Sequence, residues 1–156
     1  MEVCFLRSIE SNITEIDLQL DSFMLYCDSK QLSPKTLKSY QQTLTLFVNY
    51  LKQEINIDNA TKVKASHIRH YIQYLRERGK YTVTATEKSL NINYPNRRND
   101  YKKQISDTTI ANYTRNIKVF FNFLRDEREI KDNPMENITA IKPKRKILIM
   151  YIFQLI

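Results

Sequence analysis

Two stretches of the chain carry the same pattern of helix start, apolar stripe and polar face, and this repetition limits the possible folds. The first is 32–51, LSPKTLKSYQQTLTLFVNYL, and the second is 105–124, ISDTTIANYTRNIKVFFNFL. Ser33 and Ser106 are natural N-caps, because a serine hydroxyl can accept a backbone N–H that the first helical turn leaves free. In both stretches apolar residues recur at the 3.6-residue period of a helix. The pattern therefore predicts two equivalent amphipathic helices.

The equivalence continues along both stretches at an offset of 73 positions. The matched pairs include Tyr40 with Tyr113, Phe47 with Phe120, and Leu51 with Leu124. Because equivalent helices place paired positions in similar surroundings, we expect both tyrosine rings in the hydrophobic core. A repeat array needs three or more units, so two copies indicate one compact domain instead.

The composition favours helices over strands. One glycine and four prolines among 156 residues leave few of the turn signals that link β-strands. A chain of this length can bury a core as one domain. We therefore predict an all-α bundle of four main helices.

Two further helices complete the predicted bundle. Thr14 can cap a first helix that continues to about Lys30. Another helix is expected from Ala65 to Arg78, and Gly79 after it is typical of a helix end, where a left-handed conformation is common. The connection before that helix should place Ile57 against the core.

Residues 80–104 interrupt the helical pattern between the third and fourth helices. The segment has weak apolar periodicity, many Asn and Thr residues, and six basic against two acidic side chains. A structureless segment of this length is uncommon in a compact domain and is usually functional or disordered. We expect a long mobile loop, with a short hairpin between Tyr81 and Tyr94.

The C-terminal part departs from the helical pattern again. Asn133 and Pro134 predict a short turn in which Met135 and Ile138 are apolar anchors. The apolar stretch Ile147 to Ile156 is too short for a membrane span, which needs about 20 residues. The predicted organisation is an N-terminal arm at 1–12, a domain at 13–141 with an insertion at 80–104, and a basic linker with an apolar tail at 142–156.

Positive charge is concentrated in the later part of the chain. Residues 1–60 hold five Lys and Arg against eight Asp and Glu, whereas residues 61–156 hold twenty against nine. A formal net charge of +8 indicates an acidic partner such as nucleic acid. A basic surface kept for solubility is the common alternative, and the uneven distribution makes it less favoured.

The polar faces of the two equivalent helices carry the residue types that bind DNA. Lys and Arg neutralise phosphates, and Asn, Gln and Arg can read base edges in a major groove. The two helices could lie side by side and enter one groove together. The candidate DNA-binding residues on the helices and the linker are Lys35, Lys38, Ser39, Gln42, Thr108, Asn112, Arg115, Asn116, Lys118, Lys142, Lys144, Arg145 and Lys146.

Other site classes have little support in the sequence. Two cysteines make no disulfide framework, and Cys27 is expected in the core. His67 and His70 have the spacing of helical metal ligands, but no third ligand accompanies them, so we expect surface histidines. We therefore expect no cofactor, no metal and no small-molecule substrate. The lack of a secretory signal or membrane span suggests a cytoplasmic protein.

The order of these motifs resembles the core-binding domain of tyrosine recombinases, the phage-integrase proteins of mobile genetic elements. The resemblance rests on S-P-x-T-x-x-x-Y at 33–40 with F-x-x-Y-L at 47–51. It continues with S-x-x-T-x-x-x-Y at 106–113, F-F-x-F-L at 120–124, and N-P before a basic linker. It covers about 14–146 and implies a SAM-like four-helix bundle. In the family this module forms one half of a clamp around double-stranded DNA, and its second and fourth helices face the major groove.

The chain differs from that family in two ways. The segment 80–104 is longer than the usual link between the third and fourth helices. The resemblance also implies a catalytic domain with a nucleophilic tyrosine and a cluster of Arg, Lys and His, and the His-x-x-Arg element of that domain is absent. We therefore expect a non-catalytic, DNA-binding core domain of a truncated recombinase, whose partners are double-stranded DNA and other recombinase protomers on it.

Two other functions remain open from the sequence. One is a helical protein-interaction module without DNA binding, since SAM-like bundles associate with proteins. The other is a complete recombinase, which the missing catalytic elements disfavour. The salt dependence of binding separates the DNA-binding domain from the protein-interaction module. DNA binding weakens steeply as salt rises, whereas binding through an apolar interface does not.

Overall fold

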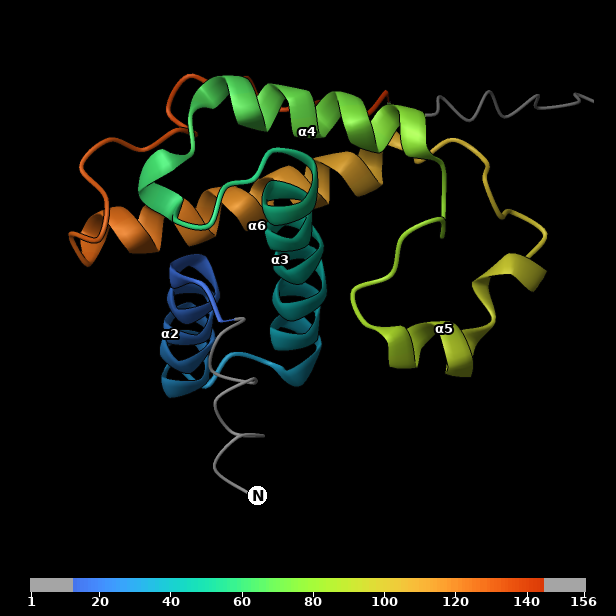
Figure 1. Cartoon of the computed structure of the whole chain (residues 1–156), viewed down its shortest axis with the longest axis horizontal. Helices are drawn as coiled ribbons and strands as arrows, with labels where there is room; N and C mark the ends of the chain where they lie inside the picture. Colours follow the sequence, from blue (N-terminus) through green and yellow to red (C-terminus); the bar gives the residue numbers. More distant parts are fainter. Residues whose placement is uncertain (1–12, 145–156) are drawn as a thin grey trace, which may run out of the picture.

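The computed structural model describes residues 13–144, and every regular element in that range is helical (Figure 1). The α-helices are α2 (Glu15–Ser29), α3 (Pro34–Glu54), α4 (Ala65–Arg78), α5 (Glu87–Asn93) and α6 (Asp107–Asp126), with 3₁₀ turns η1 (Ala60–Lys62) and η2 (Pro95–Arg97). The all-α prediction with four main helices is confirmed. No helix in the described range is long and apolar enough to cross a membrane.

The two equivalent helices begin as their shared motif predicts. Helix α3 starts at Pro34 and α6 starts at Asp107, which keeps the 73-residue offset. The Ser33 hydroxyl accepts a hydrogen bond from the Thr36 backbone N–H at 3.2 Å. The equivalent bond, from the Thr109 N–H to the Ser106 hydroxyl, has the same length of 3.2 Å. Each cap satisfies one N–H that the first turn leaves without a helical partner.

The main helices form two crossed pairs. Figure 1 shows α2 and α3 side by side, with α6 and α4 crossing the ends of that pair. At the N-terminus of α2, the backbone N–H and the hydroxyl of Thr14 both donate to the Asp17 carboxylate. Lys52 of α3 reaches the same carboxylate at 2.8 Å and so joins the two helices. Partial burial raises the pKa of Asp17, but the hydrogen bonds from Lys52 and Thr14 more than offset this and hold the pKa below its usual value.

A connected set of aromatic rings fills the core where the helices cross. Phe23 of α2 lies 5.5 Å from Phe120 of α6, measured between ring centroids, and Phe120 lies 5.5 Å from Phe121. Phe121 contacts Phe47 of α3, which packs at 5.0 Å on Tyr71 of α4. Each of the four main helices therefore contributes to one aromatic cluster, and all five of these rings are essentially buried.

The equivalent tyrosines are only half-buried, although both pack against the core. The Tyr40 ring lies 5.6 Å from that of Phe23. Neither ring is fully in solvent and neither is fully buried, so the prediction of core positions is confirmed only in part. The other predicted anchors, Cys27, Ile57 and Met135, are buried, and Ile138 packs against the core from its edge.

Gly79 ends α4 as predicted. It also lies where the two ends of the following segment, residues 80–104, come together. Its φ of +77° lies in the region that L-residues rarely adopt. A Cβ at this position would stand 2.7 Å from the Lys102 carbonyl oxygen. Beside it, the backbone N–H of Lys80 donates to the Lys103 carbonyl at 2.7 Å, and the Lys102 N–H donates to the Lys80 carbonyl at 3.0 Å.

Residues 80–104, called the arm below, contain a short helix where the sequence suggested a hairpin. Helix α5 forms over Glu87–Asn93, and no strand occurs anywhere in 13–144, so the hairpin expectation was wrong. Thr86 explains the difference, because its hydroxyl caps α5 by accepting from the Ser89 N–H at 3.4 Å. Whether the arm is mobile, and whether it forms a separate insertion in the domain, stays a prediction.

The polypeptide after α6 is held by the predicted Asn133 turn. The Asn133 side-chain oxygen accepts from the Met135 N–H at 2.9 Å, and its amide donates to Asn122 of α6 at 2.8 Å. This turn sends residues 135–141 back along α6. The predicted N-terminal arm (1–12) and most of the linker and tail (145–156) lie outside the described residues.

The Tyr71 hydroxyl supplies a stability test. The residue is 1% exposed, burial raises the pKa of its hydroxyl, and the hydroxyl has no hydrogen-bond partner among the described residues. Because an unsatisfied buried polar group costs about 1–3 kcal/mol, Tyr71→Phe should leave the free energy of unfolding unchanged or raise it by about 1 kcal/mol. Phe47→Ala removes the ring that packs on Tyr71, and it should lower the free energy of unfolding by about 3–5 kcal/mol. Urea denaturation of both variants checks this, and a loss above about 1 kcal/mol in Tyr71→Phe would show a hydrogen bond at that hydroxyl.

Candidate nucleic-acid interface

The N-terminal halves of α3 and α6 meet in one shallow hollow. Residues from both helices line it, namely Lys35, Thr36, Ser39, Tyr40, Asn112, Arg115 and Asn116. Five of these seven are candidate DNA-binding residues that the sequence placed on two separate helices. The tertiary structure therefore brings the two polar faces together at a single surface. Whether this surface contacts DNA stays a prediction.

Equivalent positions of the two helices contact each other beneath this hollow. The Asn116 side-chain amide donates to the Thr43 hydroxyl at 3.1 Å, and these two residues are 73 positions apart. The same amide donates to the Ser39 hydroxyl at 3.2 Å. A contact between matched positions means that α3 and α6 approach each other symmetrically at this crossing. The crossing sets the spacing between the polar residues on either side of it.

Asn116 is therefore engaged inside the fold. The residue is 8% exposed and its side-chain amide donates to two hydroxyls of α3. A buried amide bound in this way holds the helices in register and has no free donor directed toward a base edge. Its predicted contact with DNA stays untested, and the structure supports a positioning role. Thr43, the buried partner, was not among the predicted site residues.

The remaining helical candidates are exposed, and their charges are free of acidic partners. Lys35, Lys38, Arg115 and Lys118 take part in none of the ion pairs found within 13–144. Asp107 in the first turn of α6 is neutralised by Arg76 of α4 at 2.8 Å. Gln42, Thr108 and Asn112 add exposed polar groups to the same faces. The surface combines free cations with hydrogen-bonding side chains, which is the pattern of a phosphate-binding and base-reading face.

The polypeptide leading to the basic linker packs beside this face. Arg115 and Lys118 share a hollow with Met135, Ile138, Ala140 and Ile141. Lys142 and Lys144 follow directly and are exposed. Arg145 and Lys146 lie outside the described residues, so their predicted role has no structural test here.

The arm packs against residues of both α3 and α6, a contact that the sequence did not predict. Gln42 and Tyr113 line a pocket together with Thr84, Ala85, Ser89 and Asn93 of the arm. The basic composition of 80–104 was the one sequence feature that pointed to a binding role for the arm. Composition alone does not show where in the fold the arm lies.

The two histidines lie in the first half of α4, as the sequence predicted. No group of three or more His, Cys, Asp or Glu side chains in 13–144 could hold a metal ion. His67 instead accepts the Lys64 backbone N–H at 3.0 Å through Nδ1, at the start of α4. Burial, Lys64 and His70 lower the pKa of His67, in keeping with a neutral acceptor.

Comparison with known proteins adds sequence similarity to the fold and the matched helices. Residues 20–92 match the family model of the phage integrase N-terminal SAM-like domain. It is similar to a protein named as a tyrosine recombinase from Caldanaerobacter subterraneus subsp. tengcongensis, with 27% identity over 76% of this chain and 31% of that protein. It is also similar to the tyrosine recombinase XerC of Herpetosiphon aurantiacus, with 25% identity over 81% of this chain and 33% of that protein. The chain thus spans about a third of these relatives, and no solved structure matches it at a significant level.

The contact between matched positions predicts a stability effect of Asn116. Asn116→Ala should lower the free energy of unfolding by about 1–3 kcal/mol, because it leaves the buried Thr43 hydroxyl without its partner. Asn112→Ala, one turn earlier and exposed, should change it by less than about 0.5 kcal/mol. Thermal or urea unfolding of the two variants makes the comparison. Equal effects in both would mean that the amide bridge contributes nothing.

Proposed function

We propose that this domain binds double-stranded DNA through the α3–α6 face, as the core-binding part of a tyrosine recombinase. The observation that carries the proposal is the shared hollow, in which Lys35 and Ser39 of one helix meet Asn112 and Arg115 of its equivalent. The family match and the similarity to named tyrosine recombinases support it. Other protomers of such a recombinase, bound to the same DNA, are a further class of partner.

The proposed contacts fall into two groups. Lys35, Lys38 and Lys118, with Lys142 and Lys144 beyond the helices, would neutralise phosphates and so supply affinity that falls with salt. Gln42, Asn112 and Arg115 have donor and acceptor groups suited to base edges in the major groove. Asn116 and Thr43 would position the two helices without touching the DNA.

Arg115 offers the sharpest test of the interface. Arg115→Ala should weaken duplex binding by about 1–3 kcal/mol if the guanidinium reads a base, and should instead lower the salt slope by about one if it binds a phosphate. Lys131→Ala is the matched control, because Lys131 is exposed and lies beyond the opposite end of α6. Fluorescence anisotropy with a duplex at several salt concentrations measures both quantities. The proposed interface is wrong if Arg115→Ala and Lys131→Ala bind alike.

The salt series also separates DNA binding from a protein-interaction function. A bundle that serves only as a protein-interaction module would show no duplex binding at low salt. Duplex binding that strengthens as salt falls supports the proposal, because released counterions drive such binding.

We further propose that this domain by itself binds DNA without cutting or joining its strands. Strand exchange needs a tyrosine–phosphate bond and cations that stabilise the transition state, and binding energy without them gives occupancy but no rate. The chain should therefore shift a duplex in a gel and leave a nicked suicide substrate free of covalently attached protein. A protein–DNA adduct that survives denaturation, and disappears when one tyrosine is changed to phenylalanine, would contradict this.

A further inference from the structure

The exposed large apolar side chains of the described domain fall into two groups only. One group lies on or beside α2 and comprises Ile13, Leu18 and Leu25, of which Leu25 is 71% exposed. The other lies on the arm and comprises Val83, Leu90, Ile92 and Tyr94, of which Ile92 is 73% exposed. Contiguous exposed apolar side chains with polar rims mark interaction sites, whereas isolated ones need no explanation.

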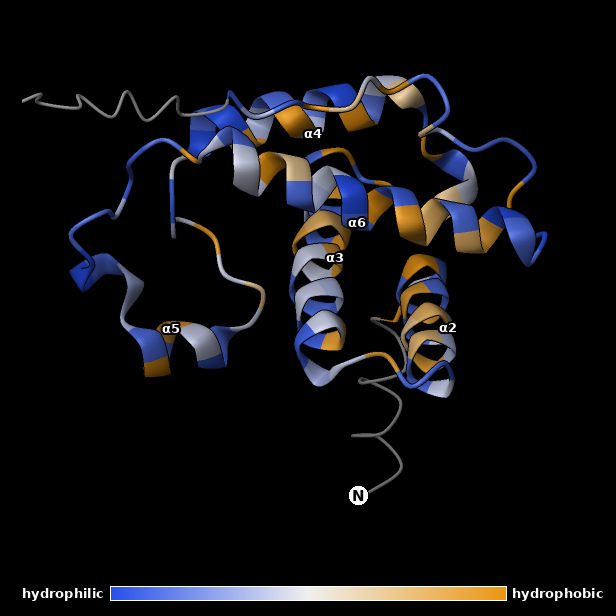
Figure 2. Ribbon diagram, turned by 180° about the vertical axis from the view of Figure 1, so that it is seen from behind, coloured by the Kyte–Doolittle hydropathy of each residue, from blue (hydrophilic) through white to orange (hydrophobic). Residues whose placement is uncertain are grey.

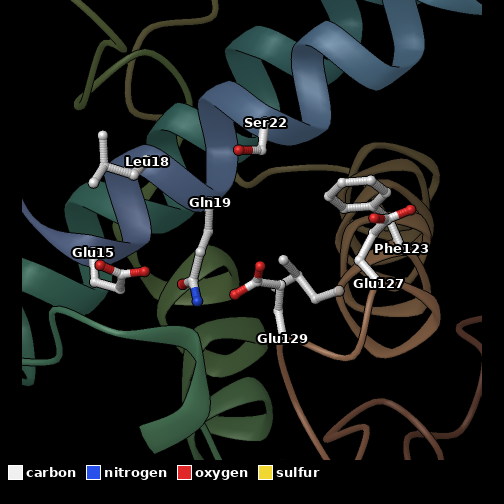
Figure 3. Close-up of a pocket in the computed structure, with 8 residues that line it drawn as sticks. Glu15, Leu18, Gln19, Ser22, Phe123, Glu127 and Glu129 are labelled. Carbon is white, nitrogen blue, oxygen red and sulfur yellow. The ribbon is translucent and has the colours of Figure 1, made fainter.

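The α2 group borders an acidic pocket. Residues of α2 and of the end of α6 line a cavity of about 170 Å³, with Leu18, Phe123 and Leu124 as apolar walls. Figure 3 shows the carboxylates of Glu15, Glu127 and Glu129 around it. None of these three forms an ion pair within 13–144. A cavity of about 150 Å³ holds a benzene ring, so this pocket has room for one side chain. We call it the acidic pocket.

The arm group has the complementary character. Leu90 and Ile92 are exposed on α5, which has no buried residue, and the exposed Lys88 lies one turn before Ile92 on the same face of the helix. The Arg97 guanidinium lies 4.7 Å from the centroid of the Tyr94 ring. Neither Lys88 nor Arg97 forms an ion pair in the described domain. The arm therefore presents apolar side chains and an aromatic ring among free cations.

The two surfaces lie on opposite sides of α3. Figure 1 and Figure 2, which view the molecule from front and back, place α2 on one side of α3 and α5 on the other. One molecule therefore does not close its own acidic pocket with its own arm. A contact that pairs two different patches of identical chains is heterologous and arranges the copies head to tail.

We propose that the acidic pocket receives the arm of a second copy of this chain. Ile92 or the stacked Tyr94 would fill the pocket between Leu18 and Phe123, and Lys88 and Arg97 would meet the three free carboxylates. Both the apolar character and the sign of charge match across the contact, and Tyr and Arg are the residue types that most often dominate interface energies. The contact is small and so belongs to the weak class of interfaces. The proposal goes beyond the proposed function and does not depend on DNA binding.

Two charge-reversed chains test the contact. The first carries Lys88→Glu with Arg97→Glu in the arm, and the second carries Glu127→Arg with Glu129→Arg at the pocket. All four residues are exposed, so both chains should fold, which circular dichroism verifies. Analytical ultracentrifugation without DNA, at concentrations up to about 1 mM because weak interfaces dissociate readily, measures association. Lys64→Glu, an exposed reversal outside both surfaces, is the control for net charge.

The expected outcome is specific to a head-to-tail contact. The unaltered chain and Lys64→Glu should associate to the same extent, whereas each double variant alone should associate at least tenfold more weakly. An equimolar mixture of the two variants should recover association, because each then finds the opposite charge on the other chain. Comparison among variants cancels any association through the apolar sequence after Lys146, which all of them share. An unaltered chain that stays monomeric, a double variant that associates normally, or a mixture that does not recover would each overturn the proposal.

Discussion

The crossing of α3 and α6 is the contact on which the rest of the domain depends. On its inner side Phe47 and Phe120, matched positions of the two helices, are both fully buried and belong to one aromatic cluster. On its outer side the Asn116 amide joins Thr43 and Ser39. The cluster provides non-directional burial energy, and the amide provides a directional bond that selects one register. Helices α2 and α4 add Phe23 and Tyr71 to the same core.

The same crossing connects stability with the proposed function. An amphipathic helix that buries its aromatic stripe must turn its polar face outward. Because α3 and α6 share one pattern and meet at matched positions, their polar faces emerge next to each other. Lys35 and Arg115 thus reach one hollow from two helices. The helical part of the proposed DNA-binding face needs no flexible loop to position it, since those residues stand on helices fixed by the core.

The arm and the acidic pocket are two further surfaces, separate from the α3–α6 face. The base of the arm is fixed by the Gly79 conformation and by the backbone bonds between Lys80 and the 102–103 segment. Its flank lies beside Gln42, whereas Leu90, Ile92 and Tyr94 are exposed. The domain therefore presents a basic face on α3 and α6, and separately a basic apolar arm and an acidic apolar pocket. The proposed DNA contact and the proposed contact between copies use different side chains and could exist together.

Local patterns in the sequence determined where helices begin and end and which of their faces are buried. The serine caps, the apolar period and Gly79 act over three to eight residues, so they can be read without knowing the fold. The match between 32–51 and 105–124 also indicated that two helices would be equivalent. The helix in the arm was missed, because Thr86 as a cap is a weak signal beside so many Asn and Thr residues.

Only the tertiary structure decided which polar residues are free to bind. Asn112 and Asn116 have the same chemistry and lie one turn apart, yet one is exposed and the other is buried against Thr43. That difference depends on the angle at which a distant helix crosses, which no local pattern contains. The acidic pocket has the same origin. Glu15 and Glu129 are far apart in the sequence, and the packing of α2 on the end of α6 brings them to one pocket.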